Sequence, residues 1–492
     1  MSGSCLMTRS MKYGKIVVGC RRKDVYREVH RQSVRQTGGQ EMQKQDLTQG
    51  SVFGNLLRFS LPYLLSCFLQ TFYGMADLFI TGQYCGADAI TAVSVGSQVM
   101  HMLTVVIAGL AMGTTVTISR RMGAGDRRMA GRATGNTVTL FAGVSILLTG
   151  VLLVAASGII RLLSVPAEAV EGTGQYLTVC FAGIPLIVGY NVLSGIYRGM
   201  GDSRHPMLFV AFSGVVNIGL DVLLIGKMGM GPFGAALATV IAQGLSVILA
   251  SAFLRRILSL QLTREDFRPD REMMCTLLAI GFPVACQDGF IQVAFLVITA
   301  IANRRGVDVA AAVGIVEKVI SFLFLVPSAM LSSVSTLCAR NAGAGLHDRS
   351  RKTLAEAMGI CIAFGLLAVI VCQFLSEDIL RLFAREEDAV IRLGGQYLRT
   401  YVLDCVFAGI HFCFSGFFCA YQKSLLSFVH NTISVLLVRI PGAYLATVAA
   451  PDTLYLMGLA PAMGSLLSAV ICLGFYLHFR PVWSGEGEKT DA

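Results

Sequence analysis

Two acidic residues lie inside long apolar stretches of this sequence. Asp77 follows Tyr73 by four residues, and Asp221 follows Asn217 at the same spacing. Residues four apart share one face of a helix, so each face would carry a carboxyl group beside a second polar group. An ion is expensive to bury among apolar side chains in a membrane, and such a residue is a functional candidate. We predict that the two faces meet and form a cation site.

The ligand of such a site would be H⁺ or Na⁺. Carboxylate, amide, phenol and hydroxyl oxygens can coordinate Na⁺, and two carboxyl groups can share protons. A neighbouring negative charge and a low dielectric both favour the protonated acid. A buried pair can therefore take up a proton on one side of a membrane and release it on the other. The competing interpretation is that Asp77 and Asp221 are hydrogen-bonded structural acids.

The elements that position these residues are membrane helices. Hydrophobic residues make up 54% of the 492 residues and charged residues only 14%, and the mean hydropathy is +0.66. Apolar runs of about 20 residues, the length that crosses a bilayer, alternate with short charged loops. The short alternating segments of an outer-membrane barrel are not seen. We expect twelve spans, approximately at residues 53–81, 89–118, 133–159, 174–197, 206–226, 234–254, 273–301, 309–338, 354–375, 392–419, 425–448 and 454–479.

The loop charges predict how the chain crosses the membrane. Loops after even-numbered spans contain seventeen Lys and Arg residues, and the opposite loops contain seven. Because basic loops stay in the cytoplasm, we expect a multi-pass protein of the plasma (inner) membrane with both termini cytoplasmic. The net charge of +10 belongs to these loops and the N-terminal tail. No basic stripe is interleaved with aromatic residues, so we expect no nucleic-acid partner.

The second half of the chain repeats the first. Three matching pairs lie 220 or 221 positions apart: residues 120–125 and 340–345, residues 174–177 and 395–398, and Pro62 and Pro283. Each unit has six spans, an even number, so the two repeats have the same orientation. Parallel repeats commonly flank a substrate cavity at their interface. The predicted fold is an all-α membrane protein with twelve transmembrane helices in two six-helix parallel repeats, an N-lobe and a C-lobe.

The chain outside the two lobes is short and polar. Its first part has many basic residues and no apolar core, so we expect it to be disordered. The expected domains are a basic N-terminal extension (1–46), the N-lobe with helices 1–6 (47–260), a cytoplasmic linker (261–272), the C-lobe with helices 7–12 (273–480) and a C-terminal tail (481–492).

The repeat also helps to separate functional residues from supporting ones. At an offset of 221, five polar residues of the N-lobe lie opposite small or apolar residues. They are Tyr73, Asp77, Asn217, Asp221 and Thr239, opposite Ala294, Ile298, Val438, Gly442 and Ala460. If the five only supported the fold, the second repeat would be expected to keep some of them. We therefore predict that they form the cation-coupling site, with Asp77, Asn217 and Asp221 as metal ligands if the ion is Na⁺.

Other polar residues and one proline within the spans are weaker candidates. Pro62 cannot donate a hydrogen bond to the carbonyl group of Arg58, so it is either a hinge in the first span or a tolerated membrane proline. Asp404 and Arg439 are candidates for an ion pair. Four residues of the seventh and eighth spans could line a cavity: Gln287, Asp288, Gln292 and Glu317.

Enzyme signatures are missing from the sequence. It has no Walker loop, no zincin motif, no Cys/His cluster and no Gly-x-Ser-x-Gly elbow. We therefore expect no enzymatic activity and no cofactor. The expected partners are a small organic substrate and the lipid bilayer, and the oligomeric state is left open.

Four motifs together resemble those of the multidrug and toxic compound extrusion (MATE) transporters, over about residues 46–480. They are Tyr73-x-x-x-Asp77, Met122-Gly123-Ala124-Gly125-Asp126, residues 195–202 (GIYRGMGD) and Asn217-x-x-x-Asp221. The resemblance implies a twelve-helix, two-lobed antiporter that exports organic, often cationic, compounds against entering H⁺ or Na⁺. It also implies an N-lobe cation site at Tyr73, Asp77, Asn217, Asp221 and Thr239, and bending of the first helix at Pro62. The N-terminal extension, and Gln287 beside Asp288 in the seventh span, depart from the family pattern.

The function we expect is export of small organic, cationic compounds by a cation-coupled antiporter with alternating access. The alternatives are a flippase for a lipid-linked precursor on a related repeated-bundle fold, and a membrane receptor or assembly factor without transport activity.

Overall fold

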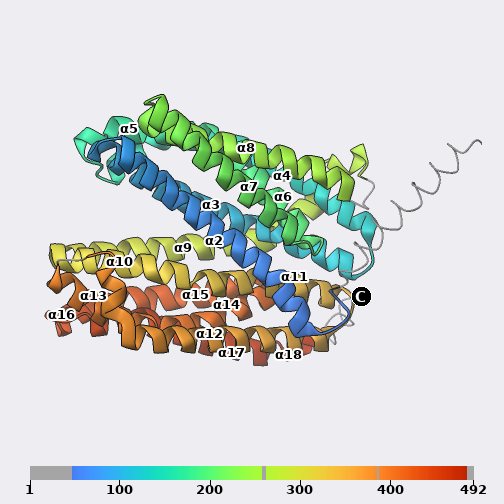
Figure 1. Ribbon diagram of the computed structural model, residues 1–492. Coiled ribbons are helices and arrows are strands. Elements are labelled where there is room, and N and C mark those ends of the chain that lie inside the picture. The colour runs from blue at the N-terminus through green and yellow to red at the C-terminus, as the bar shows by residue number, and fades with distance from the viewer. Residues whose placement is uncertain (1–46, 258–261, 385–386, 485–492) are drawn as a thin grey trace, which may run out of the picture. The chain divides into compact units, whose positions relative to one another are not determined.

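The computed structural model describes residues 47–257, 262–384 and 387–484, which are helical and contain no strand (Figure 1). In the first half, the helices are α2 (Val52–Tyr84), α3 (Ala87–Gly123), α4 (Arg127–Leu162), α5 (Ala167–Ala182), α6 (Ile184–Gly199), α7 (Arg204–Asp221), the π-helical segment η1 (Val222–Lys227) and α8 (Gly231–Ile257). The short 3₁₀ helix η2 (Arg264–Phe267) connects the two halves. In the second half, they are α9 (Arg271–Asn303), α10 (Val307–Leu323), α11 (Leu325–Gly343), α12 (His347–Arg381), α13 (Asp388–Tyr401), α14 (Asp404–Ala420), α15 (Ser424–Ser434), the π-helical η3 (Val435–Arg439), α16 (Ile440–Ala449), α17 (Tyr455–His478) and α18 (Arg480–Trp483).

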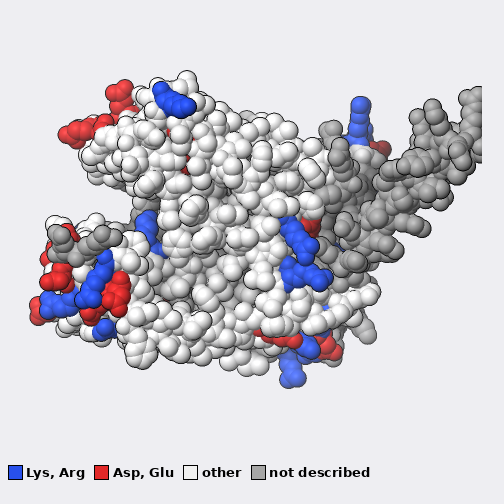
Figure 2. Space-filling model, in the orientation of Figure 1, with Lys and Arg blue, Asp and Glu red and all other residues white. Residues whose placement is uncertain are grey.

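The prediction of twelve membrane spans in two repeats is confirmed. Among the described residues, eleven helices are long and apolar enough to cross a bilayer, and the bent pair α5 and α6, with an angle of 51° between them, makes a twelfth. Large apolar side chains such as Val154 (88% exposed) and Phe374 (80% exposed) point outward. In Figure 2, most charged residues lie toward the two ends of the visible face, and the surface between them is largely uncharged. This surface suits contact with lipid.

Helix α2 belongs to both lobes. The first part of the helix carries Leu56 and Phe59, which pack in a cluster with Met330 and Leu337 of α11. Its last part carries Ile80, which belongs to the hydrophobic core of the N-lobe. Figure 1 shows α2, in blue, crossing from the N-lobe helices to the C-lobe helices. A change in the packing of one part of α2 is therefore felt in both lobes.

The lobes touch closely at the end of the bundle where α3, α6 and α11 terminate, called here the basic end. A methyl group on Gly123 would overlap the carbonyl oxygen of Arg340, and one on Gly343 would overlap the carbonyl oxygen of Arg120. These two contacts are related by the repeat offset of 220. Ser119 Oγ of α3 also donates a hydrogen bond of 2.8 Å to the carbonyl group of Thr336 in α11. At the opposite end, the surface is hollowed between α5 and α10 (Figure 2).

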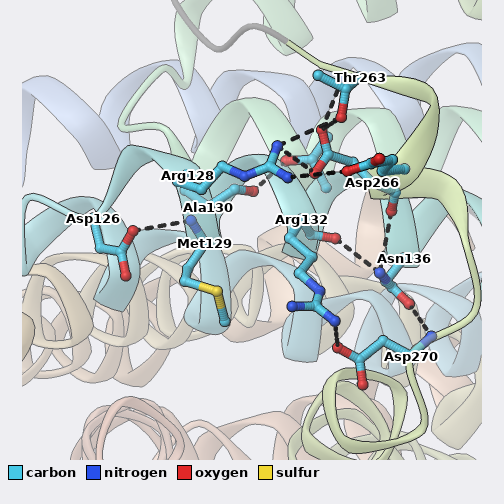
Figure 3. Close-up of polar contacts among 11 residues, drawn as sticks. Asp126, Arg128, Met129, Ala130, Arg132, Asn136, Thr263, Asp266 and Asp270 are labelled. Carbon is cyan, nitrogen blue, oxygen red and sulfur yellow. Dashed lines mark hydrogen bonds and ion pairs between the residues drawn. The ribbon is translucent and has the colours of Figure 1, made fainter.

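The segment between the lobes is held by α4 (Figure 3). Arg128 forms an ion pair with Asp266 of η2 at 3.0 Å, and Arg132 forms one with Asp270 at 2.8 Å. The amide group of Asn136 donates to the carbonyl group of Asp266 at 3.1 Å and accepts from the backbone N–H of Asp270 at 2.8 Å. The chain leading into α9 is thus fixed to the N-lobe.

The segment before α2 is held in the equivalent way by the other lobe. Arg349 of α12 donates to the carbonyl groups of Gly50 at 2.9 Å and Gln49 at 2.8 Å. The side chain of Asn55 donates to the same Gln49 carbonyl group at 2.7 Å. Each repeat therefore holds the chain that leads into the first helix of the other repeat.

The predicted N-terminal extension (1–46) lies outside the described residues, as do residues 258–261 of the lobe junction and residues 485–492 of the tail. The predicted domain boundaries at 47, 260, 273 and 480 stay predictions.

Candidate functional site

The structure brings the two predicted acidic faces together inside the N-lobe. Asp77 of α2 is 4% exposed and Asp221, the last residue of α7, is fully buried. The carboxyl group of Asp77 lies close to the side chains of Asp221, Asn217 and Thr239. Thr239 of α8 directs its hydroxyl group at Asp77 Oδ2 over 3.5 Å. The site is therefore built by three helices, α2, α7 and α8, whose polar faces meet.

Several polar atoms of this cluster have no hydrogen-bond partner among the described residues. They are Asp77 Oδ1, both carboxyl oxygens of Asp221, and the side-chain oxygen and nitrogen of Asn217. An unsatisfied buried polar atom costs about 1–3 kcal/mol, and more if it is charged. A proton shared by the carboxyl groups, or a Na⁺ ion bound by their oxygens and the Asn217 carbonyl, would remove that cost. The donor set consists of oxygens, which hard cations prefer.

Tyr73 and Gln243 lie next to this cluster. Gln243 Nε2 donates to the hydroxyl group of Tyr73 at 3.3 Å. Gln243 follows Thr239 by four residues on α8, so the site contains three pairs at the same helical spacing. Gln243 was not among the predicted site residues, although this spacing could have identified it. The pair orients the phenol hydroxyl group without placing another charge in the site.

The backbone around Asp221 departs from regular α-helix. The π-helical segment η1 begins at the next residue, Val222. Such segments widen a helix locally and are frequent at functional sites. An added Cβ on Gly214, one turn before Asn217, would lie 3.5 Å from the Tyr73 ring, an ordinary van der Waals contact. Helix α7 therefore packs directly against α2 beside the acidic residues.

Next to the acidic cluster, on its side toward the basic end, the N-lobe contains a narrow gap between side chains. Its lining mixes hydroxyl, phenol and amide groups with one valine: Tyr73, Tyr190, Val210, Ser213, Gln243 and Ser246. The Tyr190 hydroxyl donates to the carbonyl group of Pro206 at 3.0 Å. The polar character of the N-lobe interior thus continues from the acidic residues toward α6.

The equivalent region of the C-lobe is apolar. Ala294, Ile298 and Ala460, opposite Tyr73, Asp77 and Thr239 in the repeat, are buried in one C-lobe core or against it. An added Cβ on Gly442, opposite Asp221, would lie 3.1 Å from the Cβ of Ala460. Equivalent positions of the two repeats are therefore buried in both lobes, but their side chains are polar in the N-lobe and apolar in the C-lobe.

The C-lobe instead contains a buried ion pair. Arg439 Nη2 lies 3.2 Å from Asp404 Oδ2, and the two side chains are 6% and 0% exposed. The same nitrogen donates to Ser465 Oγ at 2.5 Å. The candidate pairing of Asp404 with Arg439 is thus present in the structure. The Asp404 carboxylate is thus neutralised by Arg439 and does not require an external cation.

The four residues predicted as cavity-lining have different surroundings. Gln287 is fully buried, and its side-chain atoms have no partner among the described residues. Asp288 and Gln292 are half-buried, and Asp288 lies against Gly109 of α3, 2.8 Å from an added Cβ. Glu317 is half-buried and accepts a hydrogen bond of 3.0 Å from Thr299. The cavity-lining role of these four residues stays a prediction.

Pro62 lies inside α2, which is continuous from Val52 to Tyr84. Ser66 Oγ donates to the carbonyl group of Pro62 at 3.1 Å. The described residues contain no group of three or more His, Cys, Asp or Glu side chains that could hold a metal ion. A Na⁺ ion would therefore be held by the two carboxyl groups together with amide and hydroxyl oxygens.

Comparisons with known proteins agree with this architecture. The MatE family matches residues 62–223 and 283–445, one segment in each lobe. The chain is 28% identical over 402 residues to the probable multidrug resistance protein YpnP of Bacillus subtilis (strain 168), covering 81% of this chain and 89% of that protein. It is 28% identical over 432 residues to an FAD transporter of Shewanella oneidensis, covering 82% and 92%. Its fold matches a MOP superfamily transporter from Pyrococcus furiosus with a TM-score of 0.83 and 24% identity, covering 89% and 98%. The chain belongs to the MatE family and is a MATE transporter.

Proposed function

We propose that this protein exports small organic, cationic compounds in exchange for entering H⁺ or Na⁺. The observation that carries the proposal is the buried pair Asp77 and Asp221, whose carboxyl oxygens include three without a partner among the described residues. The relative YpnP is named as a probable multidrug resistance protein, which supports an efflux role. The protein would lie in the plasma membrane with the basic end in the cytoplasm, because basic loops are retained there.

Helix α2 can link ion binding to substrate release. A proton or Na⁺ ion between the carboxyl groups removes their repulsion and draws α2 toward α7. Because the first part of α2 packs on α11, this movement changes the contact between the lobes. The close contacts at the basic end and the hollow at the other end correspond to a state open to the outside. The cation enters in this state, and the substrate leaves.

The test is uptake of a fluorescent organic cation by inverted vesicles, with a pH gradient and a Na⁺ gradient imposed separately. We expect one gradient to drive uptake by the wild type and neither to drive uptake by Asp77→Asn or Asp221→Asn. Asp378→Asn, the same change at an acid 62% exposed on α12, is the matched control and should transport normally. Normal transport by both N-lobe variants would remove the proposed mechanism.

The substrate class needs its own comparison. A relative of similar identity is named an FAD transporter, so the same vesicles should be offered FAD beside the organic cation. Uptake of FAD alone would replace the cationic substrate by an anionic one while leaving the coupling site in place. Transfer of a labelled lipid-linked precursor would favour the flippase, and the absence of all flux would favour a receptor or assembly factor.

A further inference from the structure

Arg198 is a buried, positively charged residue that is not part of the proposed coupling site. It lies in the last turn of α6 and is 6% exposed. Its guanidinium group stacks over the ring of Tyr63 in α2, 5.0 Å from the ring centroid. Nη1 donates to Ser194 Oγ at 2.6 Å, and Nε has no partner among the described residues. None of the ion pairs that these residues form includes Arg198.

The surroundings of Arg198 belong to the contact between the lobes at the basic end. The next residue, Gly199, lies against α3, where an added Cβ would be 2.9 Å from the carbonyl oxygen of Thr115. Met200 accepts a hydrogen bond of 3.0 Å from Arg340 of α11. Tyr63 lies on the part of α2 that follows Leu56 and Phe59, which pack on the C-lobe. The guanidinium group is thus enclosed where the closed lobes meet.

Two helices connect Arg198 with the coupling site. Tyr63 precedes Tyr73 by ten residues on α2, a distance of about 15 Å along the helix axis. Tyr190, which lines the narrow gap next to the acidic residues, precedes Arg198 by two turns on α6. Both helices therefore run from the acidic residues toward Arg198 and the basic end.

A buried charge without a counter-ion is costly, and a carboxylate partner would reduce that cost. An unpaired arginine, however, repels cations, as arginines in membrane pores do. A carboxylate partner would cancel this repulsion, so the absence of an ion pair keeps the electrostatic barrier. We propose that Arg198 prevents the coupling cation from leaking from the acidic pair to the cytoplasm while the lobes are closed at the basic end. This role rests on the cation coupling proposed above.

The repeat supports this assignment. At the 221 offset, Arg198 lies opposite Cys419 and Tyr63 opposite Val284. Both residues are buried in an apolar cluster. The arginine and its aromatic partner therefore occur in the lobe that has the acidic pair, and the lobe that lacks the pair has apolar residues in their place.

The experiment measures ion leak without substrate. Proteoliposomes containing wild type, Arg198→Met, Arg198→Lys, or Asp77→Asn combined with Arg198→Met are given a pH gradient or a Na⁺ gradient, and its collapse is followed. We expect Arg198→Met to collapse the gradient at least roughly fivefold faster than the wild type, which corresponds to a barrier lowered by about 1 kcal/mol. Arg198→Lys, which keeps the charge, should stay tight. The double variant should also stay tight, because the leaking ion enters through Asp77.

Two results would overturn the inference. If the ion gradient collapses no faster with Arg198→Met than with the wild type, the charge of Arg198 is not a barrier to the cation. If Arg198→Lys leaks as fast as Arg198→Met, the loss of packing on Tyr63 and not the loss of charge opens the path. Failure of the coupled transport test with the wild type would instead overturn the proposed function, and the substrate-free leak assay distinguishes that outcome.

Discussion

Arg128 and Arg349 occupy equivalent positions 221 residues apart, and each holds the chain that enters the other repeat. Arg128 binds Asp266 before α9, and Arg349 binds the carbonyl groups of Gln49 and Gly50 before α2. The basic ends of α2 and α9 are thus fixed to the opposite lobe. When the lobes move, each of these helices must turn or bend between two attachments.

The two arginines give a matched pair of variants. The Arg128 side chain is 58% exposed and its partner Asp266 is 1% exposed. Because Asp266 also accepts hydrogen bonds from Thr263, its carboxylate keeps partners in Arg128→Ala, and the variant should not unfold. We expect local release instead. Limited proteolysis should cut near Asp266 in Arg128→Ala and near Gly50 in Arg349→Ala, with slower transport in both. Unchanged cleavage would show that other contacts, such as those of Asn136, hold these segments.

Gly123 and Gly343 test the contact at the basic end. Because their neighbours are backbone carbonyl groups, no side-chain rotation can make room for a methyl group, and overpacking costs about 1–3 kcal/mol. We expect Gly123→Ala and Gly343→Ala each to part the lobes there and speed amide hydrogen exchange around Ser119 and Thr336. Gly143→Ala, with nothing within 4 Å of the added Cβ, is the control. Equal rates of amide hydrogen exchange in all three variants would contradict a close contact between the lobes at Gly123 and Gly343.

Gln243 is predicted to tune the coupling site without carrying the ion. Gln243→Leu removes the hydrogen bond to Tyr73, which is worth about 0.5–1.5 kcal/mol. The half-saturating concentration of the coupling ion should rise roughly twofold to tenfold, while the maximal rate falls little. Transport titrated against pH or Na⁺ measures this shift. Complete loss of transport would mean that Gln243 has a direct role in coupling.

The Asp404 and Arg439 pair is predicted to stabilise the C-lobe only as a pair. Breaking a buried ion pair from one side costs about 3–5 kcal/mol because a charge stays uncompensated. Asp404→Asn and Arg439→Met should each lower the melting temperature of the purified protein in detergent. The double variant should recover much of the loss. A double variant as unstable as the sum of the two single ones would argue against this coupling.

The membrane class, the approximate positions of the spans, the repeat and the unusual acids of the N-lobe could all be predicted from the sequence. Each of these follows from local information: a run of apolar residues long enough for a bilayer, a recurring segment, or two polar residues on one helical face. The offset comparison also indicated correctly that Ile298 and Ala460 replace the polar set in the C-lobe, because the repeat places equivalent residues in equivalent packing.

Which helices meet could not be predicted from the sequence and depends on the packing of the folded bundle. Gln243 reaches Tyr73, Arg198 stacks on Tyr63, and Gly123 lies against Arg340 because α8, α6 and α11 pack where they do. The full burial of Gln287, whose side-chain atoms have no partner among the described residues, is likewise a result of the packing. Spacing along one helix fixes the face on which a side chain lies, but its neighbours come from segments more than a hundred residues away, whose positions are set by packing of the whole bundle.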